Sequence, residues 1–353
     1  MAGSTRPKSN LRSALCYYYS SDKSECLQEI VSSYLHRLGP RQLPTQLAWT
    51  DISFIPCMLV PHGAYCDSGP LYAHAYSWIN SFLFDTVLII GTNHSGAGSS
   101  KMSLSPDSWQ TPIGTVDIDM DLFDAFVSMF GETIIDREAH RTEHSIENQL
   151  PFLKHLRSDV KFVALSFSRL KDLTQGHQTC QQIQKTIQLY RQRTSKRLVI
   201  VSTTDYTHYG PGYNDIHARN LSENEEYARV LDKPILQSIL SNDASQLFET
   251  QRTTQNSMCG LWPSLIIMIL SRLLNENKGQ WNLLCYHVSS EVMKRGNDVC
   301  GIMHVERIRQ YNNNDDDDTL HRSSSLTTGV ICYHGKQILT VRSFTRSLRF
   351  YHC

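Results

Sequence analysis

The sequence predicts a single α/β domain with a central, largely parallel β-sheet and helices on both faces. Short apolar runs alternate with segments of helical periodicity through most of the 353-residue chain. This alternation is typical of parallel sheets, because each crossover between parallel strands places a helix on one face of the sheet. With 40% hydrophobic residues, the chain can also bury the core that two covered faces need.

The predicted strands are apolar runs of four to seven residues, rich in Val, Ile, Leu and Phe. Such runs are typical of strands that are buried on both faces. They cover residues 54–60, 86–90, 160–165 and 198–201. The predicted helices repeat apolar residues at spacings of three and four, and they cover residues 22–38, 68–79, 120–130, 145–155, 174–191 and 261–274.

The two ends of the chain differ from this pattern. We expect residues 1–10 to form a flexible lead and residues 11–310 to form the domain. Residues 312–318 read NNNDDDD and cannot bury apolar area, so we expect residues 311–353 to be a disordered, low-complexity linker and tail. From residue 319 the tail holds five Lys or Arg and no Asp or Glu, which we interpret as a solvated basic appendage.

Composition narrows the class of function. Lys plus Arg and Asp plus Glu both number 34, so the formal net charge is zero and we expect no general attraction to nucleic acid. The longest apolar stretch, at 261–270, is shorter than the roughly 20 residues of a spanning helix, so we expect no membrane insertion. No apolar segment follows the first basic residues, and we therefore expect a cytoplasmic protein, with the nucleus as an open alternative. The ten cysteines include no CxxC pair, which argues against a disulfide framework or a zinc ribbon.

Three predicted strands are each followed by a histidine. These are His62 after the first strand, His94 after the second and His208 after the fourth. In open α/β sheets, ligands bind in the crevice beyond the carboxyl ends of the strands. A single histidine of this kind is more often structural, but three in equivalent places favour a site, and we expect the three imidazoles to converge.

The segment TEHSIEN at 142–148 has two interpretations. It is either only a helix start with acidic residues in its first turn, or it directs His144 and Glu147, one helical turn apart, into the same cleft. The position of Cys259 also has two interpretations. It lies just before a strongly apolar helix, where the helix dipole would lower the pKa of the thiol and favour a thiolate that binds metal or attacks as a nucleophile. Alternatively it is an inert, buried cysteine.

Seven ordered motifs resemble the Memo family, whose fold is related to that of the class III extradiol dioxygenases, which are non-haem iron enzymes. The likeness runs from about residue 11 to about residue 305; after residue 289 the chain departs from the family pattern, and the tail has no counterpart there. The motifs are PHGAY at 61–65, AHAY at 73–76, GTNHSG at 91–96, TPIG at 111–114, EHSIENQLPFL at 143–153, STTDYTHYG at 202–210 and MCG at 258–260.

The resemblance implies a class III extradiol dioxygenase-like fold and a metal centre. By their positions in these motifs, His62, His94 and Cys259 match the metal ligands of the family. His208 matches a further pocket histidine, and Asp205 and His144 match neighbouring positions. A thiolate here replaces the carboxylate ligand of the dioxygenases. We expect a divalent or cuprous ion, with iron favoured and copper or zinc as alternatives, because a thiolate makes the site softer.

Three hypotheses of function follow. In the first, the protein is a metal-binding, redox-active oxidoreductase in which His208, oriented by Asp205, exchanges protons. In the second, the same pocket belongs to a non-catalytic signalling adaptor that binds phosphotyrosine or a peptide, since the resemblance implies a link to cell motility. In the third, Cys259 is the nucleophile of a thiol hydrolase with His208 as its base.

Overall fold

The computed structural model describes residues 10–45, 54–213, 220–277, 279–293, 296 and 299–308. The predicted lead up to residue 9 and the predicted tail at 311–353 lie outside these residues. Within them the prediction of an α/β domain with a central, mostly parallel sheet is confirmed.

The sheet has the strand order β1-β5-β6-β7-β3-β8-β2-β11-β10. From β6 to β2 all neighbours are parallel, whereas β11 joins β2 and β10 in antiparallel pairs. Two short strands lie off this path: β4 pairs with β7 and β9 with β11. The strands are β1 Leu11–Arg12, β2 Cys57–Val60, β3 Thr86–Thr92, β4 Met102–Leu104, β5 Ser108–Thr111, β6 Gly114–Ile118, β7 Lys161–Phe167, β8 Leu198–Thr203, β9 His208–Tyr209, β10 Gln280–Val288 and β11 Val299–Ile308.

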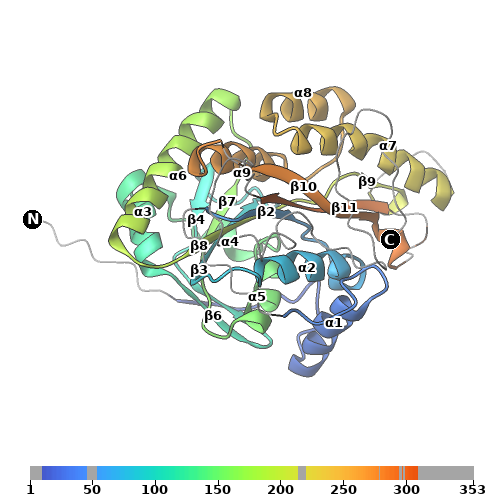
Figure 1. Cartoon of the computed structure of the whole chain (residues 1–353), viewed down its shortest axis with the longest axis horizontal. Coiled ribbons are helices and arrows are strands. Elements are labelled where there is room, and N and C mark those ends of the chain that lie inside the picture. Colours follow the sequence, from blue (N-terminus) through green and yellow to red (C-terminus); the bar gives the residue numbers. More distant parts are fainter. Residues whose placement is uncertain are drawn as a thin grey trace, which may run out of the picture.

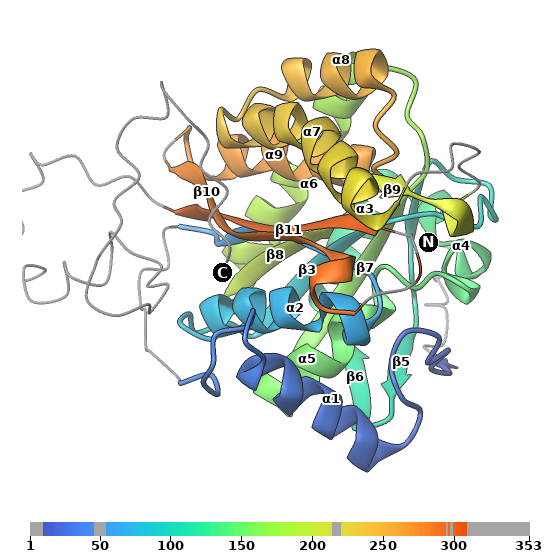
Figure 2. The same ribbon diagram turned by 90° about the vertical axis from the view of Figure 1, so that its right-hand side faces the viewer.

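Helices cover both faces of the sheet, as Figures 1 and 2 show. Successive residues of the central strand β3 feed two separate cores: Leu88 and Ile90 pack against one set of helices, and Val87 and Ile89 against the other. The helices α3, α6 and α9 pack on the first face, and α1, α2 and α5 on the second. The helices are α1 Lys23–Leu35, α2 Tyr65–Ile79, α3 Met120–Phe130, α4 Arg137–Arg141, α5 Leu150–Leu156, α6 Leu173–Arg193, α7 Leu221–Leu240, α8 Ala244–Thr254 and α9 Leu261–Leu274, with short 3-10 turns at Glu132–Ile134, Glu147–Gln149, Pro211–Tyr213 and Ser289–Glu291.

Each predicted strand and helix is present, with shifts of a few residues at some ends. The helices α3 and α9 have the predicted bounds, and α2 begins three residues earlier than predicted, at Tyr65. The antiparallel strands β10 and β11, the helices α7 and α8 and the short elements β1, β4, β5, β6, β9 and α4 were not predicted. The helix α7 has a capping box of Asn220 and Glu223, a local signal that marks its start and that we overlooked.

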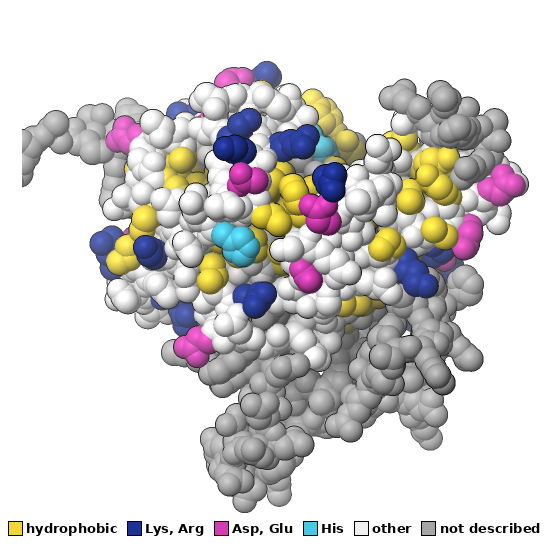
Figure 3. Space-filling view, turned by 90° about the horizontal axis from the view of Figure 1, so that it is seen from above, with side chains coloured by type: hydrophobic (Ala, Val, Ile, Leu, Met, Phe, Trp, Pro, Cys, Tyr) yellow, Lys and Arg dark blue, Asp and Glu magenta, His cyan; other side chains and the backbone are white. Residues whose placement is uncertain are grey.

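The surface and the helices can be compared with what a membrane protein or a strongly charged protein would show. Among the described residues, no helix combines the length and the apolarity that crossing a membrane requires. On the face seen in Figure 3, Lys and Arg side chains are interspersed with Asp and Glu side chains. That face therefore presents charges of both signs rather than a field of one sign.

Acid is expected to destabilise the fold through buried histidines such as His140. This side chain is 1% exposed, its Nε2–H donates to the Ser103 carbonyl at 3.0 Å, and burial lowers its pKa from 6.5 to about 4. The unfolded chain therefore binds a proton near pH 6.5 and the folded chain does not. The contribution to the free energy of unfolding is fully present above pH 6.5 and is lost as the pH falls toward 4, at about 1.4 kcal/mol per pH unit.

Chemical denaturation at pH 7 and pH 4.5 checks this prediction. The free energy of unfolding should fall from pH 7 to pH 4.5 in both proteins. In His140→Gln this fall should be smaller than in the unchanged protein by about 2 to 3 kcal/mol. The exposed His177, on α6, supplies the control variant His177→Gln, which should match the unchanged protein. Equal losses in all three proteins would contradict the prediction.

Candidate metal centre

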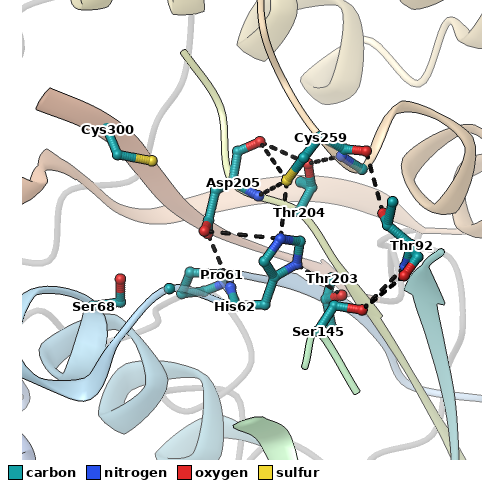
Figure 4. A network of polar contacts seen from close by, with 12 residues as sticks. Pro61, His62, Ser68, Thr92, Ser145, Thr203, Thr204, Asp205, Cys259 and Cys300 are labelled. Carbon is teal, nitrogen blue, oxygen red and sulfur yellow. Dashed lines mark hydrogen bonds and ion pairs between the residues drawn. The ribbon is translucent and has the colours of Figure 1, made fainter. Parts of the chain in front are cut away.

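Three of the predicted site residues, His62, Asp205 and Cys259, lie close together at the carboxyl edge of the parallel sheet (Figure 4). His62 follows β2, His94 follows β3 and Asp205 follows β8, and these three parallel strands are neighbours in the order β3-β8-β2. Cys259 enters the same region from the segment that leads into α9. The crevice expected beyond the strand ends is therefore where the polar side chains meet.

Three imidazoles form a cluster, but they are not the three that we expected. The ring centroids of His62 and His94 are 5.0 Å apart, and the ring of His144 lies 4.4 Å from that of His94 and 5.5 Å from that of His62. One nitrogen from each of the three rings lies within 4.8 Å of the others, close enough to bind one ion. His144 thus takes the place that the sequence analysis had given to His208.

Cys259 adds a sulfur to this cluster. Its Sγ lies 2.9 Å from His62 Nε2 and accepts a hydrogen bond from the Asp205 backbone N–H at 3.4 Å. The next residue, Gly260, packs so closely that a Cβ there would lie 2.4 Å from the Thr203 carbonyl oxygen, so only glycine fits after this cysteine.

The prediction that the helix dipole lowers the pKa of Cys259 is wrong. Burial raises the pKa of this thiol, although hydrogen bonding with His94 acts in the opposite direction. Desolvation of the thiolate exceeds the effect of the helix terminus, although Cys259 as a whole is only partly buried. Deprotonation of Cys259 therefore requires a cation nearby, as it does for a metal-bound thiol.

Glu143, to which we assigned no role from the sequence, contacts the cluster through His94. Its fully buried carboxylate accepts hydrogen bonds from His94 Nδ1 at 3.0 Å and from the His94 backbone N–H at 2.8 Å. Although burial opposes the charged form, the bonds from His94 lower the pKa of Glu143 to about 2. The carboxylate stays charged and holds the His94 ring with Nε2 facing the cluster, as carboxylates do for metal-binding histidines.

Replacing Glu143 by glutamine is expected to weaken metal binding about 10- to 100-fold, because the His94 ring loses its charged hydrogen-bond partner. Anaerobic titration of the metal-free protein with Fe²⁺ measures this effect. The matched control is Glu138→Gln, because the Glu138 side chain is 63% exposed and its ion pair is with Arg141, at 2.9 Å, on the surface. An unchanged affinity in Glu143→Gln would show that the carboxylate has no influence on the site.

The interpretation in which Glu147 faces the cleft is wrong. Glu147 is 1% exposed, and its carboxylate accepts hydrogen bonds from the Arg12 guanidinium at 2.6 Å and from the hydroxyl of Tyr19 at 2.8 Å. The backbone N–H groups of Leu15 and Cys16 donate to the same carboxylate. Glu147 thus anchors the N-terminal segment rather than the metal cluster.

The anchored segment carries an aromatic ring to the site. The Tyr18 ring lies 4.6 Å from that of His144. Burial raises the pKa of the Tyr18 phenol, and the neighbouring Asp205 and Glu143 raise it further, so the hydroxyl stays protonated and can donate a hydrogen bond. Only the tertiary structure reveals this residue, because it lies 126 positions from His144 in the sequence.

His208 and Asp205 belong to a second group next to the first. His208 lies on β9, and its Nδ1 lies 3.1 Å from the Ser257 carbonyl, which can only accept. Nδ1 therefore donates the hydrogen in this contact. One side-chain ligand atom from each of Asp205, His208 and Cys300 lies within 4.8 Å of the others. The sequence analysis did not single out Cys300.

Comparison with known proteins identifies the family of this chain. A family model described as "Memo-like protein" matches residues 13–305. The chain belongs to the Memo family. Relatives described as MEMO1 family proteins include those of Methanothermobacter thermautotrophicus, 29% identical over 82% of this chain and 96% of the relative, and of Methanopyrus kandleri, 30% identical over 80% of this chain and 93% of the relative. A solved structure of an uncharacterized protein from Escherichia coli K12 matches with a TM-score of 0.45 at 9% identity, over 71% of this chain and 99% of that one.

The match to the family model also includes most of β11, the last described strand along the chain. Its span to residue 305 takes in β10 and the greater part of β11, which lies between β2 and β10 in the sheet. The chain after residue 289, where we had noted a departure from the family pattern, therefore closes the sheet as part of the family domain.

Proposed function

We propose that this Memo family member binds a redox-active ion, iron or copper, and acts as an oxidoreductase. The observation that carries this proposal is the convergence of His62, His94, His144 and Cys259 at the carboxyl edge of the sheet. Three imidazoles and one thiol form a donor set that suits iron and copper, and zinc binds the same donors.

The protonation of the donors supports metal binding. Burial lowers the pKa of His62 well below 6.5 and that of His144 to about 4, so both imidazoles are neutral at pH 7 and keep a lone pair for a cation. Burial would also lower the pKa of His94, but hydrogen bonds with Cys259 and Glu143 raise it to about 10. Surroundings that stabilise positive charge on His94 would equally stabilise a metal ion that replaces the proton.

Access to the cluster comes from the side of His94. The His94 side chain is 28% exposed and that of His144 is 18% exposed, whereas that of His62 is 2% exposed. His62 therefore forms the floor of the site and the other two rings line its opening. A small molecule would reach the cluster past His94 and His144, next to the phenol of Tyr18.

Each residue of the site has a separate role in the proposed reaction. His62, His94 and Cys259 would hold the ion, with His144 as a further nitrogen donor, while Glu143 keeps the His94 ring in place. A bound iron or copper ion would supply one-electron chemistry and an open position for a small ligand. His208, whose Nδ1 is held by the Ser257 carbonyl, would accept a proton from the substrate at Nε2. The Tyr18 hydroxyl would orient a bound group by hydrogen bonding.

Metal content and turnover test the proposal together. The metal-free protein is reconstituted anaerobically with Fe²⁺ or Cu⁺, desalted and analysed for bound metal, and oxygen uptake is then measured with ascorbate as the reductant. We expect retained iron or copper and an uptake above that of free metal. His208→Gln should keep the ion of the histidine cluster and slow the uptake. Failure to retain either metal would overturn the proposal.

The structure does not favour the adaptor hypothesis. Phosphotyrosine sites use permanently charged groups such as arginine. Of the three clustered imidazoles, His62 and His144 are neutral because burial lowers the pKa of both, and only His94, whose pKa is raised to about 10, carries a positive charge. Binding of phosphotyrosine or a peptide in this pocket stays an untested hypothesis. So does a thiol hydrolase, for which the raised pKa of Cys259 is unfavourable because attack requires the thiolate.

A further inference from the structure

Beside the histidine cluster lies a second set of metal donors, of which the proposed function uses His208 alone, as a proton acceptor. It consists of the carboxylate of Asp205, the imidazole of His208 and the thiol of Cys300, with one ligand atom of each within 4.8 Å of the other two. Figure 4 shows Cys300 on its strand beside Asp205, on the other side of that carboxylate from Cys259. We propose that these three side chains bind a second cation, a divalent ion of the zinc class.

Backbone pairing fixes two of the donors opposite each other. The strands β9 and β11 are antiparallel, with Cys300 directly across from His208. Such cross-strand neighbours have Cβ atoms about 5 Å apart, which lets one ion bridge their side chains. Further bonds tie the same segments together: Gly301 N–H donates to the Thr207 carbonyl, and Tyr206 N–H donates to the Gly301 carbonyl, both at 2.9 Å.

The third donor, Asp205, is a buried carboxylate that lacks a permanent positive partner. It is 4% exposed, its Oδ1 accepts a hydrogen bond from the His62 backbone N–H at 2.9 Å, and its Oδ2 lies 3.9 Å from His62 Nε2. Within the described part of the chain, no Lys or Arg forms an ion pair with it. A buried carboxylate without a counter-ion is costly, and a metal ion is one of the few groups that compensates for it.

Charge and donor chemistry select the class of ion. Asp205 and a deprotonated Cys300 together carry two negative charges, which a divalent cation neutralises. A thiolate, an imidazole and a carboxylate are all ligands of zinc, with bonds of about 2.0 to 2.3 Å. Donors on such bonds lie about 3.5 Å apart, so two of the three atoms need to approach each other by about 1.3 Å at most from their present limit of 4.8 Å.

The contacts of His208 agree with its proposed role as a ligand of the second cation. Its Nδ1 is engaged by the Ser257 carbonyl at 3.1 Å, and its backbone N–H donates to the Ser257 hydroxyl at 2.7 Å. These contacts hold the ring and leave Nε2 as the free donor. A cation bound there would occupy the lone pair that otherwise accepts a proton, so His208 cannot serve both functions at once. The second ion is therefore expected to inhibit the redox turnover proposed above.

Titration with Co²⁺ under reducing conditions tests the second site, because each Co²⁺ bound to a thiolate adds a charge-transfer absorption. The metal-free full chain should saturate at two ions per chain, with thiolate absorption gained in both steps. Cys300→Ala should saturate at one ion and lose about half of that absorption. His208→Gln, which changes a half-buried side chain and leaves both thiols in place, should also bind one ion. Elemental analysis after Zn²⁺ loading gives the same count without relying on colour.

Two controls separate this proposal from the first site. Cys180→Ala removes a fully buried thiol on α6 and should keep two ions. His62→Ala should lose the first ion and keep the second, so that failure of the histidine cluster and failure of the second site give different results. One ion in the unchanged protein, or two ions in both Cys300→Ala and His208→Gln, would overturn the second site. Thermal unfolding shows that each variant is folded.

Discussion

Replacing His62 by alanine is expected to weaken iron or copper binding in the histidine cluster by more than about 100-fold. Removal of a direct ligand should exceed the 10- to 100-fold loss that follows removal of a ligand's supporting partner. His62 is the central donor, because its ring contacts Cys259 Sγ at 2.9 Å and lies near both His94 and His144. Competition with a chelator of known affinity measures the change.

The design must separate ligand loss from misfolding, because His62 is buried and its Nδ1 lies 3.1 Å from the Thr203 hydroxyl. The variant His62→Gln keeps more of the side-chain volume and should lose metal affinity as strongly. His177→Ala removes an exposed imidazole from α6 and should leave the affinity unchanged. If His62→Gln binds iron or copper as tightly as the unchanged protein, the histidine cluster is not the site.

Replacing Glu147 by alanine is expected to lower the free energy of unfolding by about 3 to 5 kcal/mol. The Arg12 and Glu147 side chains are 8% and 1% exposed and form an ion pair at 2.6 Å. Deletion of one member of a buried pair leaves an uncompensated charge, which is the cause of a loss of this size. Tyr19 and two backbone N–H groups would lose their acceptor as well. Urea denaturation measures the loss.

A comparable ion pair on the surface supplies the control. Arg252 and Glu249 pair at 2.7 Å with side chains that are 67% and 56% exposed, so Glu249→Ala should cost less than about 1 kcal/mol. We also expect Glu147→Ala to free the segment that holds Tyr18 over His144 and so to increase the quenching of Tyr18 fluorescence by an added solute. A loss in Glu147→Ala no larger than that in Glu249→Ala would refute the anchoring role.

Local patterns account for the success of the fold prediction. Apolar residues within each segment are enough to predict the strands β3 and β8 and the helices α3 and α9. A strand buried on both faces is a continuous apolar run, and a helix buried on one side repeats apolar residues at spacings of three and four, so both patterns are visible in a short stretch of sequence. The antiparallel edge strand β10 mixes buried and half-buried residues. The apolar pattern of β10 is weaker, because a strand at the edge of a sheet has a pairing partner on one side only. The position of β10 in the sheet depends on its pairing with β11.

The sequence by itself determined the fold class and the positions of His62, His94 and Cys259 at the ends of their elements, because a strand end or a helix start depends on neighbouring residues. Only the tertiary structure decided that Glu143 rather than Glu147 supports the cluster, and that Cys300 faces His208. It also decided that burial raises the pKa of Cys259. Contacts between distant segments and the loss of water around a side chain arise only when the whole chain packs, and no short stretch of sequence records them.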